Sequence, residues 1–266
     1  MTENIPNRSG DPFTTDDESQ ILNTIDRWLE KDVKDKVLAL DHADEYPTQM
    51  VEQMKSLGLF GATISQRYGG LGMPSASYAK VVTAVSEVWM SLTGIFNSHL
   101  IMAAAVERFG TEEQRQRFLP KFATGEIRGG LALTEPSCGT DLQAIRTKAH
   151  KDGDHYVING AKTWISNGIQ GDCVALLVKT DTEIQPRHKG MSLFLAEKGP
   201  GFSVGPKLKK LGYKGIDSAE LFFDDYVIAA NNLIGGQEGH GFHHTVGGLE
   251  LGRINIAARE IGRAHV

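Results

Sequence analysis

Two short stretches of the sequence carry residue types that could hold a flat, phosphate-bearing molecule. The first, LALTEPSCGTD at residues 131–141, leaves an apolar run and enters a loop of proline, serine and glycine. Gly139 lets the backbone turn its N–H groups toward an anion, and the Thr140 hydroxyl adds a donor beside it. The second stretch, WISNG at residues 164–168, places the indole of Trp164 two residues before a serine hydroxyl. Because an indole can cover a planar ring and a hydroxyl can donate to a ring nitrogen, the two stretches together predict a flavin or nucleotide site.

The residues that precede these stretches follow the period of α-helices. Apolar residues recur every three or four positions over 21–37, 47–57 and 78–88, which predicts amphipathic helices. Residues 91–109 are apolar nearly all round, which indicates a buried helix. His99 lies inside that helix, and we interpret it as a core histidine with one hydrogen-bond partner.

The period changes near residue 129. Before that point, Thr111 and Gln114 form a capping box that opens one more helix, which we expect Pro120 to kink or restart. After Gly129 the apolar residues alternate in short runs separated by DGD, NG, GP and GY turns, which is typical of an antiparallel barrel or sandwich. The helical period returns after residue 241 and continues to Val266 without a stop signal.

The predicted fold class is therefore α+β. An all-α domain is followed by an antiparallel β-barrel or sandwich that carries both candidate stretches, and the start of a C-terminal helical bundle comes last. The expected boundaries are a disordered tail at 1–16, the all-α domain at 17–128, the β domain at 129–241 and the first helix of the bundle at 242–266.

Composition limits the classes of function. The chain has 266 residues, of which 40% are hydrophobic, and a formal net charge of −5. This charge gives no reason to expect a nucleic-acid partner, which needs a basic face. Two cysteines imply no disulfide framework, and the polar N-terminus resembles neither a secretion signal nor a transit peptide. The sequence contains no run of about 18 apolar residues, so it predicts no membrane span. We therefore expect a cytoplasmic protein.

The two stretches, taken with their surroundings, resemble the acyl-CoA dehydrogenase family. Members carry a TEPxxGS/TD segment followed by a WIT/SNG segment, as here. The resemblance also covers GTEEQRQRFLPKFATGE at 110–126, KKLGYKGIDSAELFFDDYVI at 209–228 and GLELGRINIAAREIGRAHV at 248–266. It extends from about Asp17 to the last residue.

The resemblance implies an FAD-dependent oxidoreductase of fatty acid β-oxidation. Such an enzyme converts an acyl-CoA thioester to the trans-2-enoyl-CoA, transfers a hydride to flavin N5 and passes the electrons to an electron-transfer flavoprotein. It also implies a homo-oligomer, a dimer or a tetramer. Carried over by position, the cofactor-binding residues are Leu131, Leu133 and Thr134 at the pyrimidine side of the flavin, Gly139 and Thr140 at the pyrophosphate, and Trp164, Ile165 and Ser166 at the isoalloxazine, with Ser166 directed to N5. Thr140 and Arg253 are the candidate substrate-binding residues, near the CoA moiety.

No residue of the chain is assigned as the catalytic base. Most members carry the glutamate in a C-terminal domain, and we expect that domain to be missing from these 266 residues, which resemble the first two domains and part of one further helix. A minority carry it one residue before the arginine that matches Arg253, where this sequence has Gly252. Glu250 lies two residues earlier, about 200° around a helix, and is expected to be a solvated surface charge.

Other interpretations remain open. An acyl-CoA oxidase, a flavin monooxygenase on the same scaffold, or a non-catalytic partner subunit would share the flavin motifs. The histidines of GHGFHH at 239–244 could hold a metal on one helix face, but no carboxylate or cysteine follows at a matching interval, so no metal is expected. Cys138 has no basic neighbour close by in the sequence, and we interpret it as a packing residue.

Overall fold

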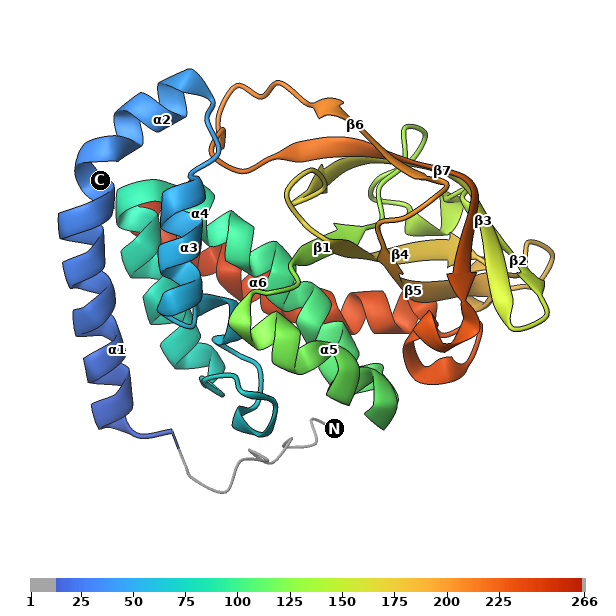
Figure 1. Cartoon of the computed structure of the whole chain (residues 1–266), viewed down its shortest axis with the longest axis horizontal. Coiled ribbons are helices and arrows are strands. Elements are labelled where there is room, and N and C mark those ends of the chain that lie inside the picture. The colour runs from blue at the N-terminus through green and yellow to red at the C-terminus, as the bar shows by residue number, and fades with distance from the viewer. Residues whose placement is uncertain (1–12, 265–266) are drawn as a thin grey trace.

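The computed structural model describes residues 13–264 and joins a helical half to a curled mixed sheet (Figure 1). The helices are α1 (Thr15–Trp28), α2 (Val37–Ala43), α3 (Thr48–Ser56), α4 (Ser75–Phe109), α5 (Glu112–Thr124) and α6 (Gly241–Ala264). The strands are β1 (Gly129–Ala132), β2 (Lys148–Asp152), β3 (His155–Ser166), β4 (Cys173–Lys179), β5 (Met191–Glu197), β6 (Phe202–Lys207) and β7 (Ser218–Ala229). The predicted class, helices followed by a sheet and a final helix, is confirmed.

The first helix begins earlier than the sequence suggests. Thr14 accepts a hydrogen bond from the Asp17 backbone N–H, and the Asp17 carboxylate accepts one from Thr14 in return, which completes a capping box. As a result α1 starts at Thr15, inside the predicted tail of residues 1–16. The rest of that predicted tail, residues 1–12, lies outside the described residues.

Helix α4 is the centre of the helical half. Trp89 interrupts it with extended backbone angles (φ −154°, ψ 105°), so the two helices predicted over 78–88 and 91–109 are present on either side of one non-helical residue. Among the described residues, α4 is the one helix that is long and apolar enough to cross a membrane by length and composition alone. Of its most apolar stretch, 78% is buried inside the protein, which is typical of the core helix of a globular fold.

Helix α5 begins at the capping box that the sequence predicts. The Thr111 hydroxyl accepts from the Gln114 N–H, and the Gln114 side chain accepts from the Thr111 N–H. The expected kink at Pro120 is absent, because α5 continues through it to Thr124. Pro120 and Gln116 are both exposed. The Gln116 carbonyl, which loses its helical partner at the proline, therefore faces the solvent side, where water can satisfy it.

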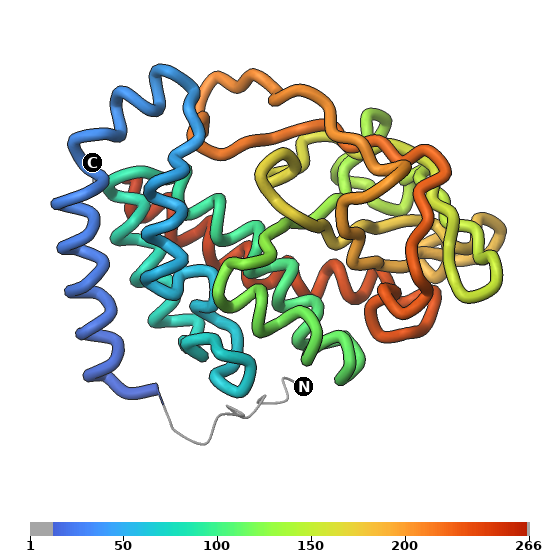
Figure 2. The backbone as a smooth tube through the Cα atoms, in the orientation of Figure 1, coloured from blue at the N-terminus to red at the C-terminus, as the bar shows by residue number. Residues whose placement is uncertain are grey.

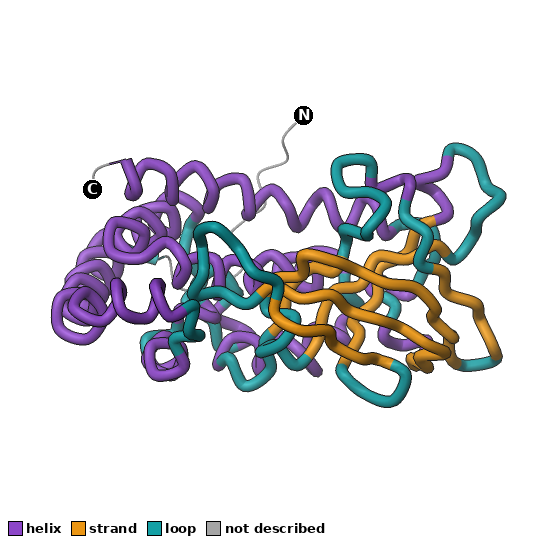
Figure 3. Tube along the Cα trace, turned by 90° about the horizontal axis from the view of Figure 1, so that it is seen from above, coloured by secondary structure: helices purple, strands orange, loops and turns teal. Residues whose placement is uncertain are grey.

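The sheet is mixed rather than purely antiparallel. Its order is β1-β4-β2-β3-β7-β6, with β5 paired to the other edge of β4. Strand β1 runs parallel to β4, and β2 meets the end of β4 in a single parallel pair, while β2–β3, β3–β7, β4–β5 and β6–β7 are antiparallel. The parallel β1–β4 pair is possible because the chain leaves β1 for the candidate loop and two further strands before β4 returns beside it. Figure 3 shows the strands gathered at one end of the molecule and the helices at the other.

The last helix connects both halves. Helix α6 packs along α4 and also contacts β4 and β5. In Figure 2, α6 is the red segment that runs along α4. Four glycines permit this close approach, because a Cβ at Gly247, Gly248, Gly252 or Gly262 would lie within 3.1 Å of an α4 atom. The helix is thus held at a fixed distance from α4, which sets the space between them.

His99 is a core histidine, as the sequence suggests, and it makes stability depend on pH. Its side chain is fully buried, its Nε2 lies 3.0 Å from the Phe122 carbonyl, and its ring lies edge-on to Phe60 and Phe122. Burial, with a smaller effect of the Arg128 charge, lowers the pKa of His99 to about 4. The unfolded chain, with its histidine pKa near 6.5, therefore binds more protons between pH 6.5 and 4. The stability that neutral His99 provides is complete above pH 6.5 and is lost as the pH falls through this window.

We predict that the free energy of unfolding of the His99→Gln variant decreases less between pH 7 and pH 5 than that of the wild type. The glutamine amide can still donate to the Phe122 carbonyl but does not titrate, so the difference in the two decreases is about 2 kcal/mol. Urea unfolding at the two pH values measures it. His244, whose pKa burial also lowers to about 4, titrates in both proteins and cancels. Parallel decreases in the two proteins would contradict the assignment.

Candidate functional site

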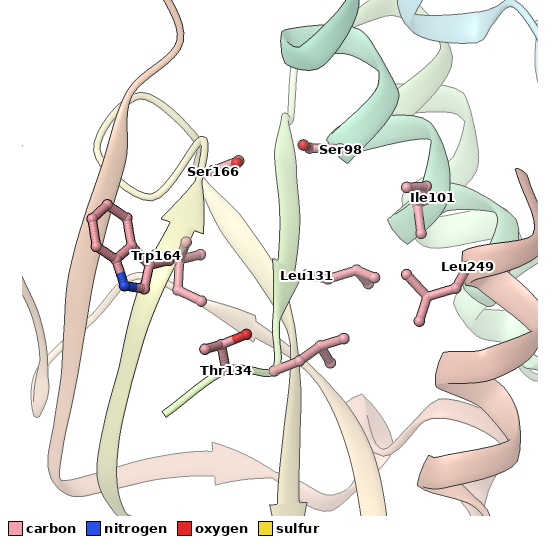
Figure 4. Close-up of a pocket in the computed structure, with 9 residues that line it drawn as sticks. Ser98, Ile101, Leu131, Thr134, Trp164, Ser166 and Leu249 are labelled. Carbon is pink, nitrogen blue, oxygen red and sulfur yellow. The ribbon is translucent and has the colours of Figure 1, made fainter. Parts of the chain in front are cut away.

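A cavity lies where the two predicted stretches meet helices α4 and α6 (Figure 4). Its volume is ≈ 190 Å³. The residues that line it are Ser98 and Ile101 of α4, Leu131 of β1, Leu133 and Thr134 just after it, Trp164, Ile165 and Ser166 of β3, and Leu249 of α6. A larger hollow of ≈ 430 Å³ lies beside α2 and α3 and includes neither stretch.

Three hydroxyl groups on the cavity wall have no hydrogen-bond partner within the part of the chain that the structure describes. They belong to Ser98, Thr134 and Ser166, and Figure 4 shows the side chains of Ser98 and Ser166 on either side of β1. The remaining wall residues are apolar apart from the indole nitrogen. An apolar cavity with a few convergent, unused hydroxyls is suited to a ligand that is largely flat and apolar with polar atoms at its edge.

Trp164 is held in an unusual backbone conformation at the mouth of the cavity. Its φ is +59°, a left-handed value that bulky residues rarely adopt. It lies at a register shift between β3 and β7, which interrupts the alternation of side chains between the two faces of the sheet. The side chain is 55% exposed. A strained residue that presents a large exposed aromatic face is typical of a binding site, where a ligand covers that face.

A buried ion pair fastens the first stretch to the second. Lys162, which is fully buried, donates to the Glu135 carboxylate at 2.8 Å and to the Leu133 carbonyl at 3.0 Å. The other Glu135 oxygen accepts the Arg146 N–H at 2.6 Å. Burial alone would raise the pKa of Glu135, but Lys162 and the N–H donors hold it below its usual value. Burial lowers the pKa of Lys162 to about 8 although Glu135 opposes the change, so both groups are charged at neutral pH.

Asn167, in the second stretch, connects the sheet to α4. Its side-chain amide donates to the Ile95 carbonyl of α4 and to the Gly129 carbonyl of β1, both at 2.9 Å. Its backbone N–H donates to the Asp217 carbonyl, and the Asp217 carboxylate accepts the Ile169 N–H at 2.7 Å. The left-handed φ of +59° at Asn167 is what aims its amide at both partners. This residue therefore fixes the distance between Ser98 on α4 and the end of β3.

The tip of the first stretch is exposed and keeps its N–H groups free. Those of Ser137, Gly139 and Thr140 have no acceptor among residues 13–264. Gly139 does not adopt the left-handed φ of an anion nest. It provides open space instead, because a Cβ there would meet only Thr134 Cγ2, at 3.8 Å. The loop can approach an anion with three donors, but neither Gly139 nor Thr140 lines the cavity itself.

Helix α6 presents different faces to the cavity and to solvent. Leu249 lines the cavity, and a Cβ at Gly252 would lie 2.7 Å from Cδ1 of Ile101, a cavity residue. Glu250 faces elsewhere and pairs with Arg108 of α4 at 2.7 Å on the surface. Arg253 is exposed and does not line the cavity. The position that faces the cavity thus has no carboxylate, and the neighbouring carboxylate is paired on the surface.

The histidines near residue 240 pack as rings. His244 stacks on Phe109 with the centroids 4.6 Å apart, and His243 lies edge-on to the same ring. Within residues 13–264 no cluster of three or more potential metal ligands exists. Cys138 is partly buried against the core, and Cys173 is buried beside Met102.

The structure thus brings six of the eight predicted cofactor residues to one cavity and leaves Gly139 and Thr140 beside it. Their roles stay predictions. Sequence reasoning pointed to the region 88–99 as a wall of the acyl pocket, but it did not single out Ser98, Ile101 or Leu249. It also missed the Glu135–Lys162 pair. The available signal for that pair was that Lys162 is the one lysine, arginine or acidic residue in β3, with a glutamate inside the first stretch.

We predict that Lys162→Met costs about 3–5 kcal/mol of unfolding free energy, because it leaves the Glu135 carboxylate buried without a cation. The double variant Glu135→Gln/Lys162→Met removes both charges and should recover most of that loss. Urea unfolding of the two variants and the wild type measures this. A single variant within 1 kcal/mol of wild type, or a double variant no more stable than the single, would contradict the assignment.

Comparison with known proteins places this arrangement in one family. The acyl-CoA dehydrogenase N-terminal domain matches residues 15–126, and the acyl-CoA dehydrogenase middle domain matches residues 130–226. The short-chain specific acyl-CoA dehydrogenase of Clostridium acetobutylicum is 37% identical over 252 residues, which are 94% of this chain and 66% of that protein.

Solved structures agree. Butyryl-CoA dehydrogenase from Megasphaera elsdenii superposes with a TM-score of 0.89 at 32% identity, over 96% of this chain and 67% of that one. A glutaryl-CoA dehydrogenase from Mycobacterium smegmatis, in complex with FADH2, superposes with a TM-score of 0.84 at 25% identity, over 94% of this chain and 62% of that one. The chain spans about two thirds of the length of these relatives. With both domain matches, the fold and the cavity in agreement, the chain belongs to the acyl-CoA dehydrogenase family.

Proposed function

We propose that the cavity binds FAD and the thioester end of an acyl-CoA, and that the chain supplies the flavin-binding part of an α,β-dehydrogenase that forms a trans-2-enoyl-CoA. FAD, when bound, supplies a hydride acceptor at N5. The observation that carries the proposal is the exposed, left-handed Trp164 beside the free hydroxyls of Thr134 and Ser166. One structural neighbour contains FADH2, which supports the choice of cofactor.

The residues present fit a flavin by their chemistry. The Trp164 indole offers a face of the size of a fused ring system, and the two hydroxyls can donate to ring oxygens and nitrogens. Leu131 and Leu133 supply an apolar surface beside them. The free N–H groups at the tip of the first stretch suit a pyrophosphate, for which backbone donors are the usual partners. The left-handed backbone at Trp164 is then a strain that ligand binding offsets.

The chain's own contribution to the reaction is position and polarisation. Holding the thioester against a flavin converts an encounter into an intramolecular step. Removing the weakly acidic α proton needs a carboxylate base and donors for the thioester oxygen. None of the nine residues that line the cavity is a carboxylate, and Glu250 is paired with Arg108. The residues that line the cavity therefore bind and orient, while the proton acceptor is a group other than these nine residues.

The electron acceptor follows from the proposed reaction. A dehydrogenase passes its electrons to an electron-transfer flavoprotein, whereas an oxidase or a monooxygenase uses oxygen. Family membership favours the dehydrogenase. Oxygen consumption in the presence of an acyl-CoA distinguishes the two, since it is absent in a dehydrogenase.

We expect the purified chain, supplied with FAD, to bind it and to keep it oxidised when butyryl-CoA is added without oxygen. Binding is measured by quenching of flavin fluorescence, and reduction by loss of the visible flavin absorbance. The Trp164→Ala variant should bind FAD at least tenfold more weakly, because it loses the covering aromatic face. Wild-type affinity in that variant would contradict the site, and rapid bleaching in the wild type would show that a described residue acts as the base.

Placing a carboxylate at residue 252 should create a base. The Gly252→Glu side chain projects toward Ile101, and the contact at 2.7 Å involves the flexible end of that isoleucine, which can move. A positioned general base contributes about 10²–10⁴-fold to proton transfer. We therefore expect the FAD-loaded Gly252→Glu variant to bleach with butyryl-CoA at least about 100-fold faster than Gly252→Gln, the matched control of equal shape. Equal rates in the two variants would contradict the proposed orientation.

A further inference from the structure

The loop between β6 and β7 runs from the strand beside Ser166 to helix α4. It occupies residues 208–217 and leads into Ser218, which pairs with Ser166 on the cavity wall. From there it reaches across to the helical half, as the upper loop in Figure 1 shows. A Cβ at Gly215 would lie 2.3 Å from the Trp89 ring, so the loop lies directly on the break in α4. The loop thus spans from the sheet side of the cavity to its helical side.

Tyr213 of this loop also packs against α4. Its φ is +59°, and its hydroxyl would lie 1.5 Å from a Cβ at residue 94. Only a glycine at residue 94 leaves room for it. Gly94 is one helical turn, about 6 Å, from Ser98 on the same face of α4. The tyrosine hydroxyl therefore stands about one turn beyond the cavity wall, between α4 and α6.

Arg259 of α6 meets Tyr213 from the other side. One terminal nitrogen donates to the Tyr213 hydroxyl, and the guanidinium lies 5.1 Å from the ring centroid. Its Nε is buried and has no acceptor, and no carboxylate in the described part of the chain forms an ion pair with it. Burial raises the pKa of Tyr213 although Arg259 opposes the change. The phenol therefore stays neutral and cannot balance the positive charge.

The surroundings add a cation and no anion for Arg259. Lys210 Nζ lies 5.2 Å from the centroid of the Tyr213 ring and donates to the Ile216 carbonyl at 2.7 Å. Asp44 is already paired with Lys207 at 2.7 Å. A partly buried cation without a counter-ion and a buried donor without an acceptor each cost free energy. An anionic ligand with two acceptor oxygens bound next to Arg259 would offset both costs.

We propose that Tyr213 and Arg259 form the far end of the acyl channel and bind a carboxylate there, so that the substrate is the CoA thioester of a short dicarboxylic acid. This inference rests on the proposed function, since it assumes that the thioester lies at Ser98 and Ser166. The distance of one helical turn allows only a few methylene groups between the thioester and the carboxylate. Longer chains meet the Tyr213 ring. The guanidinium and the phenol O–H supply the donors that a carboxylate accepts.

The test compares two acyl-CoA probes of equal chain length. Glutaryl-CoA and valeryl-CoA both carry five acyl carbons, and only the first ends in a carboxylate. Each is titrated without oxygen into the FAD-loaded full chain, and binding is followed by calorimetry and by the shift of the flavin spectrum. We expect glutaryl-CoA to bind at least tenfold more tightly than valeryl-CoA.

Variants at residues 213 and 259 test whether these two side chains cause the preference for glutaryl-CoA. Arg259→Met and Tyr213→Phe should each weaken glutaryl-CoA binding at least tenfold and leave valeryl-CoA binding within twofold of wild type. Tyr213→Phe keeps the aromatic ring against Gly94, so the loop keeps its contact with α4. Arg263→Met is the matched control, because Arg263 is an exposed arginine one turn further along α6, and it should change neither affinity.

Equal affinity for the two probes in the wild type would overturn the inference while leaving the proposed function in place. An equal decrease in affinity for glutaryl-CoA and valeryl-CoA in Arg259→Met would also overturn the inference alone, since the arginine would then not act on the carboxylate. Failure of both probes to bind the FAD-loaded chain would overturn the inference and the proposed function together.

Discussion

The buried pair of Glu135 and Lys162 is the interaction on which the site depends. Glu135 belongs to the first stretch, whereas Lys162 lies 27 positions later, two residues before the second stretch, and each would be costly to bury alone. Together they bring the start of the candidate loop against β3, beside the backbone bond from the Thr163 N–H to the Thr134 carbonyl. This fixes Thr134 and Trp164 at opposite sides of one opening. Glu135 and Lys162 therefore have a structural role, which leaves the neighbouring hydroxyls and the indole of Trp164 free for a ligand.

A second constraint comes from close packing between the helices and the sheet. Asn167 holds α4 and β1 together through both hydrogens of one amide group. Glycines at residues 94, 215 and 252 then admit a tyrosine, a tryptophan and an isoleucine at distances that no side chain would tolerate. The cavity is the space that remains after these contacts are made. Its shape therefore follows from small residues on the helices as much as from the motif residues.

The sequence predicted what depends on local patterns. The capping box at Thr111, the buried helix over 91–109 and the change of period at Gly129 were all readable, because each depends on neighbours within a few positions. The parallel pairing of β1 with β4 was not, since Gly129 meets Cys173 across 44 positions. The same limit applies to the site. Motif residues on β1 and β3 could be named from spacing, but the identity of Ser98 and Leu249 as wall residues depends on how two distant helices pack. The contact of Tyr213 with Gly94 depends on the left-handed backbone of Tyr213. A tyrosine does not favour that conformation, so the sequence did not predict it.

The packing of α6 on α4 also has a consequence for synthesis of the chain. Helix α4 is complete at Phe109, but the helix that covers its flank begins only at Gly241, after the 131 residues from 110 to 240. At about 5–20 residues per second, roughly 7–26 s of translation separate the two. During that interval the most apolar helix of the described chain has an uncovered side, lined by the residues that later meet the glycines of α6. The nascent chain at this stage therefore exposes apolar surface, which makes incompletely folded chains prone to aggregation.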